Sequence, residues 1–144
     1  MFDEQYVDPS RVSFDAFKAL DRTTPIFMLN KLKFYDQARY ETGHPLADTR
    51  MTGAEAYANY GADSGPIFSC VGGSIVWRGN FESTVIGPRD ESWDQVFIAR
   101  YPNAGAFLKM VTDPVYQQAV KHRQAAVLTS RLRRFGELEL GNTF

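Results

Sequence analysis

The stretch TDPVYQQAVKHRQAAV, residues 112–127, predicts a helix with a well-marked start. Asp113 can accept hydrogen bonds from the free N–H groups of the first turn, and Pro114 suits the first helical position, where no N–H group is needed. At 3.6 residues per turn, Arg123 falls in the middle of an otherwise apolar side. That side is formed by Val115, Tyr116, Ala119, Val120, Ala126 and Val127. Because arginine is always charged, its side chain there must find partners or reach water.

The segments on either side of this helix predict strands and one more helix. WDQVFIARYP, residues 93–102, has apolar residues at both parities of a strand, which indicates that both of its faces are covered. NAGAFLKMV, residues 103–111, begins a helix that the TDP turn interrupts. LTSRLRRF, residues 128–135, alternates enough to form a last strand, and GELELGNTF is a tail.

Further upstream, two strands flank another helix. TPIFMLNKLKF predicts a first strand over Pro25 to Phe34, with Asn30 at the same parity as its apolar residues. A helix begins at Thr52, because Glu55 three residues later completes a capping box. GSIVWRGNFESTVIGP, residues 73–88, reads as a long or broken strand interrupted near Gly79.

The helix that begins at Thr52 has two contrasting sides. Its inward side is predicted to consist of Ala54, Tyr57, Ala58, Gly61 and Ser64, with Glu55, Asn59 and Asp63 on the opposite side. The preceding segment, residues 35–51, has turn residues and no sustained period. A connection of that length is more often functional than a short one.

The order of elements predicts an α+β fold of the ferredoxin-like βαββαβ type, with a four-stranded antiparallel sheet and an extra N-terminal helix. We expect a single domain over 1–144, with an extension over 1–24, a core over 25–135 and a tail over 136–144. Helices cover only one face of such a sheet. An identical copy is the simplest partner for the open face, so the sequence predicts a homodimer.

Composition narrows the class of protein. A chain of 144 residues with 44% hydrophobic residues can bury one ordinary core. The net charge of -1 leaves no field that would attract nucleic acid. One cysteine and the absence of a signal-peptide pattern fit a cytoplasmic protein. No apolar run approaches the roughly 20 residues that span a bilayer, so we expect no membrane association.

Taken together, the quoted stretches resemble the domain-of-unknown-function family 1330, of the dimeric α+β barrel superfamily. The resemblance covers roughly Pro25 to Phe135, and TDPVYQQAVKHR is its most specific part. It implies a ferredoxin-like protomer whose sheet closes into a barrel with that of a second copy. It implies no activity, because fold does not determine function. The N-terminal helix and the YETGHPLADTR loop look like additions specific to this branch.

Arg123 admits two interpretations. It can be structural, bonded to strand-end carbonyls or to a carboxylate such as Glu41, Glu55 or Asp94. Alternatively, it lines a cavity between helix and sheet and binds an anionic or carbonyl-bearing ligand through its planar guanidinium. Asn30 and Tyr57 would then share that cavity, although an interior asparagine more often satisfies backbone groups.

The two histidines are the candidates for proton transfer. His122 lies at the border of the apolar side, where it can act as a general base or simply as a solvated residue. His44 belongs to the long loop, and it matters only if that loop folds over the site. In an enzyme, His122 or Tyr57 would move a proton and Arg123 would stabilise negative charge.

Aromatic residues admit a structural and a ligand-binding interpretation as well. The set is Tyr57, Trp77, Phe81, Trp93, Phe97 and Tyr101. These residues can pack the core and a dimer interface, or stack a flat apolar ligand. We take Trp77 and Phe97, with Asn30 and Arg123, as the candidate ligand-binding residues.

No cofactor or metal motif is present. Neither the histidines nor the single cysteine has ligand spacing, and no glycine-rich phosphate loop occurs. Two classes of function therefore remain. One is a protein that binds a small apolar or carbonyl-containing metabolite between helices and sheet. The other is a cofactor-free enzyme, monooxygenase-like or isomerase-like, acting on a small aromatic or carbonyl compound.

Overall fold

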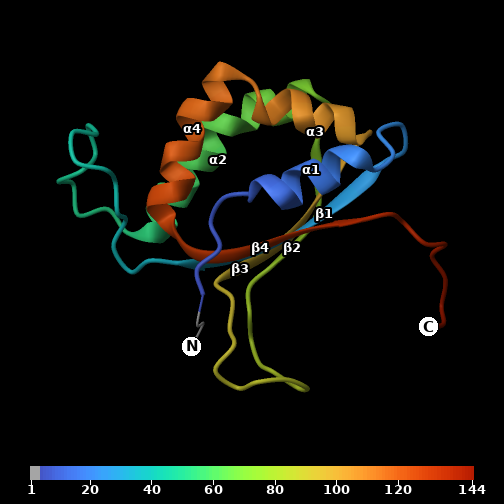
Figure 1. Cartoon of the computed structure of the whole chain (residues 1–144). Coiled ribbons are helices and arrows are strands. Elements are labelled where there is room, and N and C mark those ends of the chain that lie inside the picture. The colour runs from blue at the N-terminus through green and yellow to red at the C-terminus, as the bar shows by residue number, and fades with distance from the viewer. Residues whose placement is uncertain (1–3) are drawn as a thin grey trace.

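The computed structural model describes residues 4–144 and shows a four-stranded antiparallel sheet with helices on one face (Figure 1). The elements in chain order are α1 Arg11–Ala19, β1 Ile26–Phe34, α2 Gly53–Cys70, β2 Ser74–Gly79, β3 Gln95–Tyr101, α3 Ala104–Val111, α4 Pro114–Ala126 and β4 Val127–Phe135. The strand order β2-β3-β1-β4 is that of a ferredoxin-like α+β fold. The predicted fold class is confirmed.

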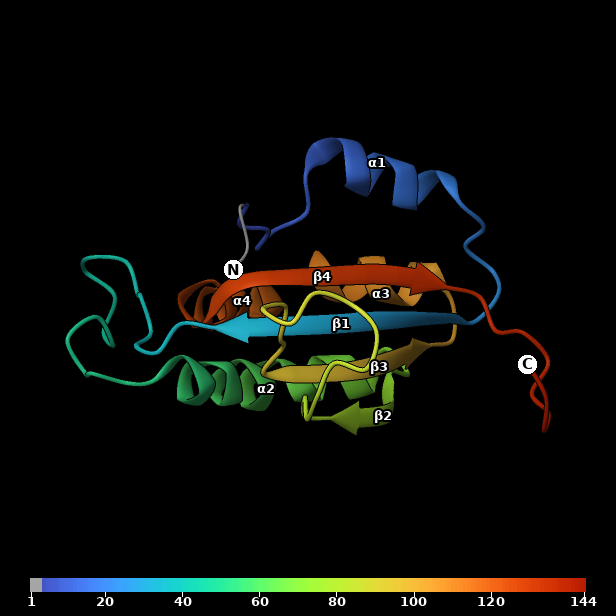
Figure 2. The same cartoon turned by 90° about the horizontal axis from the view of Figure 1, so that it is seen from below.

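Side chains of the two central strands, β1 and β3, point alternately to a face covered by helices and to a bare face. In β1, Ile26, Met28, Asn30 and Leu32 are buried beneath the helices, and the residues between them face the other way. In β3, Ala99 and Tyr101 belong to the same core. This alternation follows from the two-residue period of a strand. Figure 2 looks onto the bare face, which the loop between β2 and β3 crosses.

Helix α2 starts with the predicted capping box. The Thr52 hydroxyl accepts the N–H of Glu55, and the Glu55 carboxylate accepts the N–H of Thr52. The predicted inward side was wrong in part, because Ala54, Ala58 and Gly61 are exposed. The side chains that face the core are those of Ala56, Tyr57, Tyr60, Ser64, Ile67 and Phe68. Tyr57 and Tyr60, which adjoin Ala58 and Gly61 in the sequence, determine the buried side, since burying them removes more apolar area from water than burying alanine or glycine does.

Helix α4 begins as its sequence predicts. The Asp113 carboxylate accepts hydrogen bonds from the N–H groups of Val115 at 2.8 Å and Tyr116 at 3.4 Å, and Pro114 is the first helical residue. Tyr116 and Ala119 are buried, whereas Val115, which was predicted on the same side, is 62% exposed.

The strand predicted over residues 73–88 is shorter than expected. Only Ser74–Gly79 pairs with β3, and a β-bulge interrupts the register between Ile75 and Trp77. The remainder forms the loop over residues 80–94. Gly87 in this loop adopts a φ of 140°, a conformation that side-chain-bearing residues rarely adopt and that ends any continuing strand.

Gly53 lets α2, α4 and β1 meet closely. Its N–H donates to the Tyr35 carbonyl at 3.2 Å. A Cβ atom at this position would overlap that carbonyl oxygen and lie 2.9 Å from the Ala126 carbonyl oxygen. Both obstacles are backbone atoms, so neither can move aside without shifting an element.

We expect Gly53→Ala to lower the free energy of unfolding by roughly 1–3 kcal/mol, the usual cost of overpacking. Alanine normally stabilises a helix relative to glycine, so the sign itself is diagnostic. Gly61→Ala is the matched control, because a Cβ there meets nothing within 4 Å. The control should gain about 0.5–1 kcal/mol. Urea unfolding of both variants measures the difference, and equal effects would contradict this account.

None of the helices between residues 4 and 144 is long and apolar enough to cross a membrane.

Candidate functional site

Arg123 points to the seam between α4 and β4, where the N-terminal segment lies. Its guanidinium donates hydrogen bonds to the Val7 carbonyl and, at 3.1 Å, to the Ser130 hydroxyl. The segment is also held by the Ser130 N–H, which donates to the Tyr6 carbonyl at 2.7 Å. Backbone and hydroxyl oxygens therefore satisfy the charged group, and the partner is neither Glu41, Glu55 nor Asp94.

This geometry supports a structural role for Arg123. We expect Arg123→Met to lower the free energy of unfolding by about 1.5–3 kcal/mol, the usual worth of hydrogen bonds to a charged group. The loss should concentrate in the N-terminal segment. Amide hydrogen exchange checks this, because the N–H of Tyr6, now bonded to the Thr129 hydroxyl at 3.0 Å, should exchange faster. Unchanged protection at Tyr6 would contradict the anchoring role.

Beneath the helices, three of the predicted ligand-binding and catalytic residues lie near one another. Asn30 pairs across the sheet with Phe97, and both face α2. Phe97 and Tyr57 pack against the same cluster around Leu32. Burial raises the pKa of the Tyr57 hydroxyl above its ordinary value, and the positive charges of Arg123 and Arg78 oppose that rise. The Asn30 amide donates to the Met28 carbonyl at 3.0 Å, which is a backbone-satisfying bond.

Trp77, the other predicted ligand-binding residue, does not join this group. It pairs with Ile98, which in turn pairs with Leu29, so all three lie on the bare face. Its side chain is 53% exposed. The β-bulge beside it shifts the strand by one residue, and such a shift exchanges the two faces.

The long loop over residues 35–51 folds back against α4. The N–H of Arg39 donates to the Ala125 carbonyl at 2.8 Å, and the N–H of Tyr35 donates to the Ala126 carbonyl at 2.9 Å. At its other end, the N–H of Ala38 donates to the Met51 carbonyl at 2.8 Å. These bonds satisfy the last carbonyls of α4 and fix the loop beside the helix pair α2 and α4.

His122 sits between a phenol and a carboxylate. Its Nδ1 atom lies 2.6 Å from the Tyr40 hydroxyl, and its Nε2 atom lies 3.1 Å from an oxygen of Asp63. A carboxylate accepts hydrogen bonds only, so in the neutral imidazole Nε2 carries the hydrogen and Nδ1 accepts the phenolic proton. The His122 side chain is 14% exposed and that of Asp63 is 56% exposed, so the array opens onto the surface.

Three further groups surround this Tyr40–His122–Asp63 array. The His44 ring stacks on the Tyr40 ring at 4.5 Å between centroids and meets the His122 ring edge-on at 5.9 Å. Burial raises the pKa of the Tyr40 hydroxyl, and the negative charge of Asp63 adds to the rise. A hydrogen bond with Asn59 opposes it. The sequence predicted a role for His44 only if its loop folds over the site, and the loop does bring His44 beside Tyr40 and His122.

The array has the chemistry of a proton relay. A base bonded to a hydroxyl and oriented by a carboxylate can take the hydroxyl proton and hold the resulting charge. Across residues 4–144, no group of three or more histidine, cysteine, aspartate or glutamate residues is placed to hold a metal ion. Proton transfer is the reaction that these groups can perform with their own atoms.

Sequence reasoning identified His122 but not its partners. Asn59 and Asp63 were placed on the polar side of α2 without a role, and Tyr40 was not singled out. Two features of the sequence pointed to this site. Asn59 and Asp63 are four residues apart and therefore share a helix face, and the 35–51 loop is unusually long.

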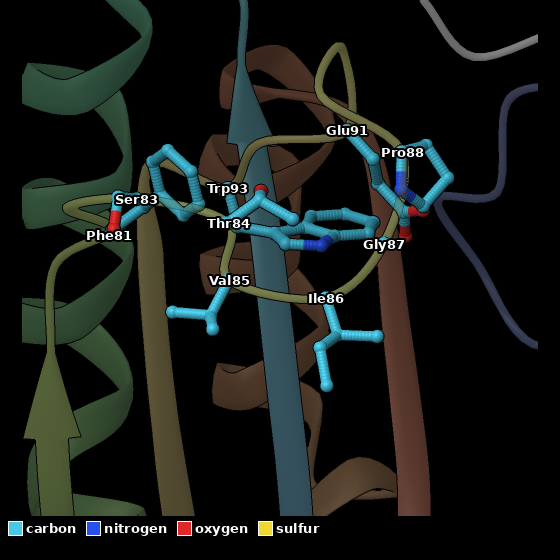
Figure 3. Close-up of a pocket in the computed structure, with 9 residues that line it drawn as sticks. All are labelled: Phe81, Ser83, Thr84, Val85, Ile86, Gly87, Pro88, Glu91 and Trp93. Atoms are coloured by element: carbon cyan, nitrogen blue, oxygen red, sulfur yellow. The ribbon is translucent and has the colours of Figure 1, made fainter.

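A second feature is a cavity of about 390 Å³ under the 80–94 loop, on the bare face (Figure 3). It is lined by Phe81, Ser83, Thr84, Val85, Ile86, Gly87, Pro88, Glu91 and Trp93. Glu91 is the single titratable group in this lining, and Val85 and Ile86 point away from the Trp93 ring. An open lining with one titratable group offers packing rather than acid–base chemistry.

Comparisons place the chain among proteins of unknown function. A family model described as a domain of unknown function, DUF1330, matches residues 42–132. The crystal structure of RPA0582, a protein of unknown function from Rhodopseudomonas palustris, is 50% identical with a TM-score of 0.87, covering 95% of this chain and 100% of that one. No curated protein shows significant similarity.

A more distant structure shares the fold alone. SnoaB, a cofactor-independent oxygenase from Streptomyces nogalater, is 17% identical with a TM-score of 0.51 and covers 81% of this chain and 96% of its own.

Proposed function

The chain belongs to the domain-of-unknown-function family 1330, and we propose that it is a cofactor-free enzyme that moves a proton on a small carbonyl-containing or phenolic metabolite. The observation that carries this proposal is the Tyr40–His122–Asp63 array, with contacts of 2.6 Å and 3.1 Å. The sequence predicted a ligand-binding pocket between helices and sheet. The array instead lies between the 35–51 loop and the helix pair α2 and α4.

The reaction uses Tyr40 as the group that touches the substrate. His122 Nδ1 accepts the phenolic proton while the Tyr40 oxygen takes a proton from a carbon next to the substrate carbonyl. The imidazolium that forms lies 3.1 Å from Asp63, which stabilises its charge. The reverse transfer returns a proton to a different substrate atom. The net change is an isomerisation, which conserves atoms and electrons without an oxidant.

The environment of Tyr40 suits this role. A phenol whose pKa is raised by burial gives a phenolate that is a stronger base when it forms. The His44 ring stacks on one face of the Tyr40 ring. The fold is also compatible with catalysis without a cofactor, because SnoaB, described as a cofactor-independent oxygenase, has it.

Hydrogen exchange at carbon tests the proposal. The protein is incubated in D₂O with a panel of 1,3-dicarbonyl compounds, aryl ketones and phenols, and loss of C–H signals is followed by NMR. Exchange with at least one class, faster than in buffer and dependent on His122, supports the proposal. Exchange at the buffer rate with every class would contradict it.

A second candidate function is binding without turnover, between helices and sheet. The Tyr57 ring packs against Phe34 and Tyr60, and its hydroxyl lies within the fields of Arg78 and Arg123. A carbonyl-bearing molecule beside Asn30 and Phe97 could accept its hydrogen bond. Native mass spectrometry of the purified protein tests this, because a retained small molecule should be lost in Tyr57→Phe.

We also propose that the protein is a homodimer through the bare face of the sheet. Apolar side chains on strands β2 and β4 of this face remain exposed, with Trp77 at 53% and Phe135 at 49%. In the 80–94 loop, Val85 and Ile86 are 91% and 96% exposed. Exposed apolar side chains gathered on one face are typical of an interface.

A further inference from the structure

The bare face has a definite arrangement of residues, which the strand register gives row by row. One row crosses the sheet through Phe135, Phe27, Arg100 and Ser74, the next through Arg133, Leu29, Ile98 and Trp77, and the third through Arg131, Lys31, Val96 and Gly79. The middle row is apolar except at the β4 edge. The face is therefore an apolar band with a basic border.

The charges on this face have one sign. Its strand residues include Lys31, Lys33, Arg100, Arg131 and Arg133 and no aspartate or glutamate. Lys33 already pairs with Asp94 at 3.4 Å, and Arg131 lies over the Tyr6 and Trp93 rings. Two such faces placed directly together would bring Lys31, Arg100 and Arg133 of both copies close, and like charges in an interface cost several kcal/mol. Carboxylates set opposite Arg100 and Arg133 would relieve this repulsion.

The C-terminal tail, residues 136–144, carries suitable groups. Glu137 and Glu139 alternate with Leu138 and Leu140, the pattern of an extended segment with one acidic and one apolar side. Leu138 is 86% exposed and Leu140 is 85% exposed. The tail leaves the end of β4 and runs away from the body of its own protomer (Figures 1 and 2). Its apolar side thus lacks a partner within the protomer.

We propose that the tail of each copy lies across the bare face of a second copy, with Glu137 and Glu139 against Arg100 and Arg133. Leu138 and Leu140 then contact the apolar band. The inference rests on the proposed dimer. It adds that the C-terminal tail supplies the carboxylates that offset the repulsion between the two basic faces. The tail complements the bare face in charge and in polarity. Its carboxylates can face the basic residues while its leucines, which alternate with them, face the apolar residues.

A charge swap between two separate chains tests the inference. The tail variant carries Glu137→Lys and Glu139→Lys, and the face variant carries Arg100→Glu and Arg133→Glu. Each variant alone sets like charges against each other in its own homodimer. A mixture of the two restores both contacts, but only if the tail of one chain meets the face of the other. Light scattering and analytical ultracentrifugation measure the dissociation constant of each sample, and circular dichroism confirms that each variant is folded.

We expect the wild type to be a dimer at micromolar concentration and each variant alone to dissociate at least about tenfold more readily, because unlike pairs become like pairs. The mixture should return to within about threefold of the wild type. A chain ending at Phe135 loses both tail contacts without gaining like charges, so it should weaken the dimer less than the tail variant does. Mixing it with the face variant should restore one of the two contacts, because the acidic tail of the face variant still meets the basic face of the truncated chain. Glu41→Lys with Asp48→Lys, the same charge change on exposed loop residues, should have no effect.

Three results would overturn the inference in different ways. A monomeric wild type would remove the proposed dimer and the tail contact with it. A dimer that the tail variant and the truncation leave as tight as the wild type would keep the proposed interface and exclude the tail from it. Rescue within one chain carrying all four substitutions, without rescue in the mixture, would place the contact within a protomer and also overturn the inference.

Discussion

Replacing His122 by glutamine lowers the rate of carbon-bound hydrogen exchange by roughly 10²–10⁴-fold, the usual contribution of a positioned general base. Glutamine can occupy similar space and form hydrogen bonds, but it cannot take the Tyr40 proton and carry the charge beside Asp63. Affinity for the compound should change little, because His122 touches the substrate only through Tyr40. NMR exchange rates measured over a range of compound concentrations separate the two effects.

The partners of His122 give a graded pattern. Tyr40→Phe removes the hydroxyl that meets the substrate, so its loss should match that of His122→Gln. Asp63→Asn retains both other groups and should lose less, since Asp63 only orients His122 and stabilises its charge. Lys121→Gln, an exposed neighbour on α4, is the control and should exchange at the wild-type rate. Tyr40→Phe with wild-type exchange would show that the relay does not carry the reaction.

The parts of the fold that local residues determine could be predicted from the sequence. The capping box of Thr52 and Glu55 and the start of α4 at Asp113 involve groups within three residues of each other, so spacing alone identifies them. The buried side of α2 was misassigned in part because alanine and glycine give little information about burial. The contact with Tyr116, whose hydroxyl lies 2.8 Å from that of Tyr60, decides that side instead.

The candidate site could not be assembled from sequence for a related reason. Its three groups come from the 35–51 loop, α2 and α4, and Tyr40 and His122 are 82 residues apart. Likewise, the carbonyl that Arg123 binds belongs to Val7, which is 116 residues away. The wheel of α4 showed that Arg123 needed a partner, but only the path of the chain could supply it. The β-bulge at Trp77 could not be predicted either, because no residue near it in the sequence fixes its position.

Raising the pH above about 10 should unfold the protein steeply, because three buried tyrosines resist ionisation. Burial raises the pKa values of Tyr57, Tyr101 and Tyr116 above the ordinary value of about 10. In the unfolded chain these phenols lose their protons near pH 10, whereas in the folded chain they keep them. The folded state therefore binds more protons, and the free energy of unfolding falls as the pH rises. Below pH 10 the stabilising contribution is fully present.

The slope follows from the number of protons. Each tyrosine contributes about 1.4 kcal/mol per pH unit, so three contribute about 4 kcal/mol per pH unit above pH 10. A domain with about 5–15 kcal/mol of stability would be lost within a few pH units. Urea unfolding between pH 9 and pH 12 measures the slope, and tyrosinate absorbance reports when the phenols ionise. The phenols should ionise together with unfolding rather than before it.

Tyr101→Phe isolates one of the three protons. Tyr101 is 4% exposed and its hydroxyl lies 3.8 Å from the Met110 sulfur, so removing that oxygen gives up only a weak contact. The slope above pH 10 should fall by about a third, from about 4 to about 2.7 kcal/mol per pH unit. Stability at pH 7 should change little, because the phenol is neutral in both states there. An unaltered slope in Tyr101→Phe would mean that the buried phenols are not what alkaline pH acts on, and that the interior beneath the helices admits water and charge.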